Sequence, residues 1–145
     1  MSFLDALNTS ASGLSAQRLR MNLISSNLAN SNTTRTAEGG PYKRKDAVFS
    51  ANPQQPSFKD ALSQRLEPQN IEVQVTEIRD DPRAPITKFD PGHPDADEQG
   101  YITLPNINVV EEMVNMISAS RGYEANVTAI RATKEMAADA MEIGR

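Results

Sequence analysis

The sequence predicts an α+β protein that is mainly α, in which two long terminal helices pair as an antiparallel coiled coil and a small, irregular, partly β region lies between them. Three observations predict this fold class. Apolar residues recur every seven positions near each end of the 145-residue chain. All nine prolines fall between Pro41 and Pro105. Alternating apolar residues, which are typical of strands, occur within that proline-rich middle.

The first helix is expected over residues 1–31. Its apolar residues at seven-residue spacing form one stripe: Leu7, Leu14, Met21 and Leu28. Gly13 and the many Ser and Asn residues are poor helix formers, so the helix is expected to depend on packing for its stability. The second helix is expected over residues 108–143, with Asn106 or Asn108 as its N-terminal cap. Gly122, in the middle of this helix, indicates a close backbone contact.

The second helix carries an apolar stripe of the same kind. Its seven-residue spacing and the flanking positions give six expected pairing residues: Val109, Met113, Met116, Tyr123, Val127 and Ile130. Because the two stripes lie at opposite ends of the chain, their pairing brings the termini together.

The central region, residues 32–107, is expected to hold short strands. One runs from Tyr42 to about Ser50, a second follows the alternation of Ile71, Val73 and Val75, and a third is "APITKF", residues 84–89. A short helix is expected over residues 57–66. Residues 90–100, "DPGHPDADEQG", form a loop.

Charge and cysteine content exclude several classes of protein. The chain carries 15 basic and 19 acidic residues, a net charge of −4, which argues against nucleic-acid binding. It has no cysteine, so disulfides, thiolate zinc sites and cysteine nucleophiles are excluded. The N-terminus has neither a basic segment nor a continuous apolar segment, so we expect no cleaved signal peptide. No apolar run approaches the roughly 20 residues that cross a bilayer, so we expect no direct membrane insertion.

The sequence gives only weak support for a metal site or a catalytic site. Asp95, Asp97, Gln99 and Gly100 match the first positions of a calcium loop, but Asn106 stands where a bidentate carboxylate is needed. We therefore expect a solvated acidic turn and no metal site. His93, the one histidine, is expected in a turn or at an interface because no partner pattern for catalysis accompanies it.

Other charged groups also point to ordinary surface roles. We expect the carboxylate pairs 80–81 and 111–112 to be solvated, because nothing in the sequence indicates that they are buried. The basic stretch "YKRK", residues 42–45, is expected to form a solvated face or to contact an acidic neighbouring subunit. No catalytic site and no cofactor is predicted.

The remaining faces of both helices carry small and amide side chains. A two-stranded helix pair would leave these faces exposed to solvent. These side chains permit close approach and can hydrogen-bond across a wet interface, which favours packing on several sides by copies or relatives of the chain. These residues are Ser10, Ser12, Ser15, Asn22, Ser26, Asn27, Asn30, Asn115, Ser118 and Asn126.

The stretch "SSNLANSNTTRTAEGGPYKRK", residues 25–45, resembles the N-terminal signature of bacterial flagellar rod and hook proteins. The family pattern Asn-Leu-Ala-Asn-x-x-Thr is matched by Asn27, Leu28, Ala29, Asn30 and Thr33. Residues 90–130 are similar to the proximal-rod member of the flagellar basal-body rod family. The resemblance covers residues 1–50 and 71–143 and fades over 52–70, which is interpreted as a variable insertion.

The resemblance implies a structural subunit of the basal-body rod, the drive shaft that transmits torque from motor to hook. The subunit polymerises through its terminal helices, and its motif faces neighbouring subunits. The implied partners are copies of itself, other flagellar rod proteins and the flagellar type III export apparatus, and the ring at the rod base is a further candidate. The implied location is the periplasmic rod, reached without a cleaved signal peptide.

Two rival functions remain at this point. A soluble coiled-coil adaptor or homodimer with a central binding module predicts ordered terminal helices in the isolated protein. An enzyme or metal-binding protein, ranked third, predicts metal binding at Asp95 and Asp97 or loss of activity when His93 is replaced. A rod subunit predicts helices that order only on assembly, because their outer faces are polar.

Overall fold

The computed structural model describes residues 3–53 and 71–144, with Asn52 and Pro53 described by their backbone alone. Its elements are α1 (Phe3–Ala29), β1 (Lys45–Pro53), β2 (Ile71–Asp80), β3 (Ile86–Phe89), β4 (Tyr101–Leu104) and α3 (Val109–Ile143). The predicted α+β, mainly α class is confirmed. The helix expected at 57–66 and most of the insertion expected at 52–70 lie outside the described residues.

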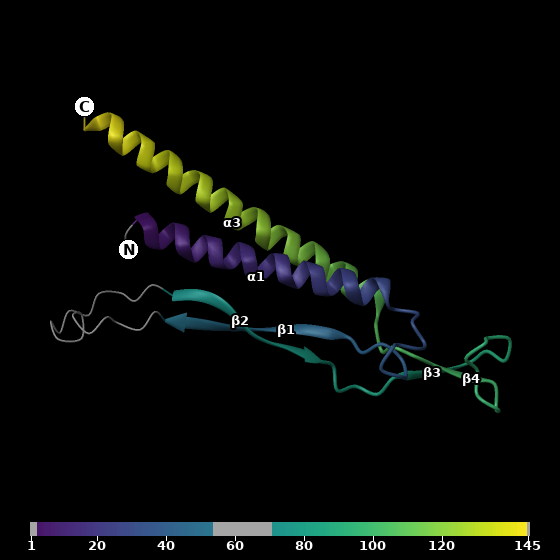
Figure 1. Cartoon of the computed structure of the whole chain (residues 1–145). Coiled ribbons are helices and arrows are strands. Elements are labelled where there is room, and N and C mark those ends of the chain that lie inside the picture. The colour runs from purple at the N-terminus through teal and green to yellow at the C-terminus, as the bar shows by residue number, and fades with distance from the viewer. Residues whose placement is uncertain (1–2, 54–70, 145) are drawn as a thin grey trace, which may run out of the picture.

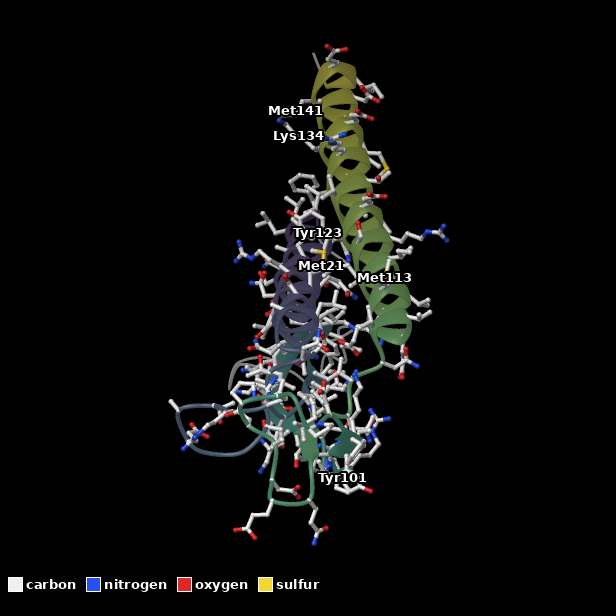
Figure 2. All side chains as sticks on the ribbon, turned by 90° about the vertical axis from the view of Figure 1, so that its right-hand side faces the viewer. Met21, Tyr101, Met113, Tyr123, Lys134 and Met141 are labelled. Carbon is white, nitrogen blue, oxygen red and sulfur yellow. The ribbon has the colours of Figure 1, made fainter. Side chains whose placement is uncertain are left out.

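The helices α1 and α3 lie side by side and run in opposite directions, so both termini are at one end of the molecule (Figure 1). Met21 and Tyr123 lie where the two helices meet, and α3 continues beyond the start of α1 to Met141 (Figure 2). The core between the helices is narrow. Among the described residues, the buried apolar side chains are Ala16, Ile24, Ile102 and Ala119.

Asn108 is the N-cap of α3, one of the two caps that the sequence offered. Its side chain accepts hydrogen bonds from the backbone N–H of Val110, at 3.0 Å, and of Glu111, at 3.3 Å. The cap thereby satisfies two N–H groups that have no partner within the helix. Two acidic residues in the first turn, Glu111 and Glu112, further favour a helix start here.

The strands β1 and β2 form a two-stranded antiparallel ribbon that lies along α1 (Figure 1). Short hydroxyl side chains of α1 attach it. Ser12 Oγ accepts a hydrogen bond from Val73 N at 3.1 Å, and Thr9 Oγ1 donates one to Ile71 O at 3.4 Å. The expectation that Ser12 would stay uncovered is therefore wrong, because its small side chain lets β2 approach the helix.

The strands β3 and β4 form a second two-stranded ribbon, at the end of the molecule opposite the termini (Figure 1). Phe89 and Tyr101 are opposite each other in the register, with their rings edge to face and the centroids 5.3 Å apart. The sequence patterns do not predict β4, and they predict a first strand from Tyr42, whereas β1 starts at Lys45.

Candidate assembly site

A buried polar cluster joins the two helices to the central region, and we call its members Asn27, Tyr42, Arg44 and Glu112 the polar clamp. Asn27 is 0% exposed and Glu112 is 1% exposed. The Asn27 amide donates to Glu112 Oε2 at 3.1 Å and to Lys45 O at 2.9 Å. Its carbonyl oxygen accepts from Lys45 N at 2.9 Å and from the Tyr42 hydroxyl at 3.1 Å. One amide side chain therefore links α1 to α3 and to the start of β1.

Arg44 supplies the positive charge that pairs with the buried Glu112 carboxylate. Its Nε and one terminal nitrogen both lie 2.9 Å from Glu112 Oε1. Burial alone lowers the pKa of Arg44, but the hydrogen bond and the charge of Glu112 outweigh it, so the net shift is upward. The expectation that Glu112 is solvated is therefore wrong. The expectation that the basic stretch is solvated or contacts a neighbouring subunit is wrong at Arg44. The reason is the same for both residues, because their charges pair with each other within the chain.

A second ion pair extends the clamp to the end of β2. The Arg44 guanidinium lies 3.8 Å from Asp81 Oδ2, and Arg83 contacts the same oxygen at 2.6 Å. Hydrogen bonds from the side chain and backbone of Arg83 hold the pKa of Asp81 below its usual value. Asp81 therefore stays ionised between two arginines and fixes the chain after β2 against the clamp.

The family-motif residues have distinct places around the end of α1. Asn27 belongs to the clamp, so the expectation that it faces neighbouring subunits is wrong: the chain itself buries and satisfies it. Asn30 Nδ2 donates to Ser26 O at 2.9 Å and Asn30 Oδ1 accepts from Thr33 Oγ1 at 3.2 Å, so these two side chains close the helix end. Leu28 is half-buried and Ala29 is exposed.

Two glycines let amide side chains approach the opposite helix closely. A Cβ at Gly13 would lie 3.0–3.2 Å from side-chain atoms of Asn126, and a Cβ at Gly122 would lie 3.2 Å from Gln17 Cδ. Gly122 thus has the close contact that its position predicted. Asn126, expected on an uncovered face, lies in the seam because Gly13 leaves room for it.

The expected pairing residues fall into two groups. Eight are half-buried, namely Leu7, Leu14, Met21, Leu28, Met116, Tyr123, Val127 and Ile130. Val109 and Met113 are exposed, at 44% and 54%. The contribution of all ten to pairing and assembly remains a prediction.

The first turns of α3 also carry apolar side chains that the rest of the described chain leaves open. We call Val110, Met113, Val114 and Ile117 the outer stripe; their exposed fractions are 54–69%. They recur at spacings of three and four residues and so share one side of the helix. Exposed apolar patches of this kind mark interaction surfaces.

The acidic loop after β3 is organised by its own turns. Asp97 Oδ1 accepts from the backbone N–H of Gln99 and Tyr101, and Asp95 accepts from Thr34 Oγ1 at 2.7 Å. His93 Nδ1 accepts from the N–H of Asp95. Within residues 3–53 and 71–144, no group of three or more His, Cys, Asp or Glu side chains is placed to hold a metal ion.

Neither of the described helices is long and apolar enough to span a membrane.

Sequence comparison identifies related families at both ends of the chain. Residues 7–35, which include most of α1 and the family motif, match the family described as flagella basal body rod protein. Residues 98–143, which include β4 and α3, match the C-terminal family of flagellar basal body rod FlgEFG proteins. The two matches thus contain Asn27 and Glu112, the two most deeply buried members of the clamp.

Full-length relatives carry the name flagellar basal-body rod protein FlgC. The protein from Borreliella burgdorferi is 43% identical over 99% of this chain and 98% of its own length. That from Bacillus subtilis is 41% identical over the whole of both chains, and that from Salmonella typhimurium is 35% identical over the whole of both. The chain therefore belongs to the flagellar basal-body rod proteins, as a FlgC-like member.

Proposed function

We propose that this chain is a structural subunit of the flagellar basal-body rod and polymerises through α1 and α3 into the tube that transmits torque to the hook. The observation that carries the proposal is the helix pair. Its sequence matches rod-protein families, and its outer stripe is exposed. Head-to-tail contacts between identical or related subunits produce an open helical assembly when the rotation between neighbours does not close a ring.

The packing of the pair supports assembly with further helices. Only three of its side chains are both apolar and buried among the described residues: Ala16, Ile24 and Ala119. Burial of apolar area is the main stabilising contribution to helix packing. A pair with so narrow a core gains stability when neighbouring subunits cover its remaining apolar side chains.

The partners follow from this role. We propose contacts with copies of the chain and with other flagellar rod proteins, and export by the flagellar type III apparatus without a cleaved signal peptide. The assembled site is then the periplasmic part of the basal body, and the ring at the rod base is a further candidate partner. Residues 1–31 and 108–143 serve as the rod helices, and 32–107 as the outer region.

The proposed role is structural rather than enzymatic. The clamp contains an ion pair, but its charged groups are used in mutual contacts that hold elements together. The relatives carry the name of a rod protein. We therefore assign no catalytic residue and no cofactor.

Hydrogen–deuterium exchange of the purified free chain tests whether the helices need neighbours. We expect fast exchange in the halves of α1 and α3 nearest the termini, residues 3–20 and 120–143, because few buried contacts hold them. We expect slower exchange near Asn27 and Glu112, where the clamp satisfies the buried polar groups.

The rival role as a coiled-coil adaptor gives the opposite pattern. It predicts a discrete homodimer in which both helices are protected along their whole length. Light scattering on the same sample identifies the dimer. A monomer with exchanging helix ends supports the rod subunit, and a protected dimer contradicts it.

A further inference from the structure

We propose that the register of the α1–α3 pair is set by its amide, glycine and carboxylate contacts, and that the apolar stripes alone do not select it. The inference concerns one chain and therefore stands independently of polymerisation. It assigns a positioning role to Gln17, Gly122, Asn27 and Glu112. Their contacts decide which part of α3 extends past α1.

The polar contacts define a single register. The paired residues are Gly13 with Asn126, Gln17 with Gly122, and Asn27 with Glu112. In each pair the two residue numbers add up to 139, as expected for antiparallel helices without a slip. This register places Phe3 level with Met136, so that residues 137–143 of α3 extend beyond α1. Figure 2 shows that extension, which carries Met141.

The apolar stripes permit a second register. They repeat every seven residues, so a seven-residue slip places apolar positions opposite apolar positions again. α3 has 35 residues and α1 has 27, and a slip to a sum of 146 still leaves every residue of α1 opposite a residue of α3. In that register α1 is opposite residues 117–143, and α3 has no extension at its C-terminal end.

The polar contacts exist only in the observed register. After the slip, Gln17 would be level with Ala129 and Gly13 with Thr133, so neither amide would meet a glycine. Asn27 would be level with Ala119 and would lose its bond to the Glu112 carboxylate. A buried amide or carboxylate without a hydrogen-bond partner is disfavoured. An apolar residue tolerates the slip, because another apolar position then lies opposite it.

Gln17 supports a positional role in particular. Its Oε1 atom is buried and has no hydrogen-bond partner among the described residues. A side chain with an unsatisfied polar atom is a poor choice for stability alone. The shape of the Gln17 side chain explains a positioning role, because the side chain fills the space that Gly122 leaves and does so at one position along the helix.

Disulfide trapping tests the register directly, because the natural chain has no cysteine. The native pair is G13C/N126C, because a Cβ at residue 13 lies 3.2 Å from Asn126 Cγ, the position that the sulfur of a cysteine at residue 126 can occupy. The slipped pair is G13C/T133C. Each full-length chain is oxidised in a buffer with trimethylamine N-oxide, which favours the compact state. Intrachain links are measured by gel mobility and by mass spectrometry.

The two pairs are compared in four backgrounds: unaltered, Q17A/G122A, Q17A/G122A/N27A/E112A, and a control. Alanine is the strongest helix former, so the first altered background keeps both helices. The control background N22A/S118A changes two exposed residues of the same helices. We expect the native pair to link about tenfold or more faster than the slipped pair in the unaltered and control backgrounds.

The ratio of the two rates decides the inference. We expect it to fall in Q17A/G122A and to approach one when all four residues, and with them both the Gln17–Gly122 and the Asn27–Glu112 contact, are replaced. An unchanged ratio in both altered backgrounds would show that the stripes or the chain connections set the register. Failure of the native pair to link in the unaltered background would equally overturn the inference.

Discussion

Replacing Glu112 with alanine is expected to lower the free energy of unfolding of the clamp region by about 3 kcal/mol. The substitution removes the main partner of Arg44, whose side chain is 12% exposed, and one acceptor of Asn27. Loss of one member of a buried ion pair leaves the other charge without compensation. Asp46 and Asp81 also lie near Arg44, so we place the effect at the lower end of the range for buried pairs.

Thermal unfolding and hydrogen exchange of the free chain measure this effect, with two matched variants. E111A removes the neighbouring exposed glutamate in the same helical turn and is expected to change stability by less than about 0.5 kcal/mol. E112Q keeps one oxygen that can accept from Arg44, but its NH2 group would face the Asn27 amide and the Arg44 charge would lose its partner, so we expect a loss of about 2 kcal/mol, between E111A and E112A. If E112A is no more destabilised than E111A, the clamp does not hold the helices to the central region.

The second large effect concerns assembly rather than stability. The double substitution V114D/I117D places two charges in the outer stripe. Both residues are exposed in the free chain, at 61% and 54%, so its stability is expected to change by less than about 0.5 kcal/mol. In an assembled rod the same positions would be desolvated, and two buried unpaired carboxylates would prevent the contact. We expect cells that carry this variant to be non-motile and to lack the chain in purified basal bodies.

The apolar variant V114L/I117L is the control at the same positions. It preserves the apolar character of the outer stripe and is expected to retain incorporation and most motility. Immunoblots of whole cells establish that both variants are made in equal amounts. Normal incorporation of V114D/I117D would exclude the outer stripe as an assembly surface.

The helices and their antiparallel pairing follow from local sequence patterns. Seven-residue spacing is a property of short windows, and it identified both helices to within a few residues of α1 and α3. The cap at Asn108 is a similarly local feature, because its bonds reach only two and three residues along the chain. Short-range geometry of this kind can be read directly from the amino-acid order.

The clamp could not be predicted in the same way. Arg44 and Glu112 are 68 residues apart, and nothing in either local stretch indicates that the other lies beside it. Glu112 in the first turn of a helix resembles an ordinary solvated residue that favours the helix start. Asn27 belongs to a recognisable motif, but an amide is equally suited to bonds within a chain and between chains. Only the fold places it against Lys45 and Glu112.

The missed strand β4 has a related cause. It has four residues, and its strand conformation depends on pairing with β3 across an eleven-residue loop. Strand propensity reflects packing against neighbours more than an intrinsic backbone preference, so a four-residue stretch carries little signal by itself. The apolar residues of "YITL" indicate a strand only once Ile86 and Phe89 are known to lie opposite them.

Electron cryomicroscopy of basal bodies from the organism that encodes this chain shows whether the α1–α3 pair is part of the rod wall. We expect density for the pair in the wall, with the outer stripe of α3 against a neighbouring subunit. We also expect the polar clamp to be intact at the base of each pair. Absence of the chain from the rod would rule out the proposed function, and a rod in which Val114 and Ile117 face solvent would rule out the outer stripe as its assembly surface.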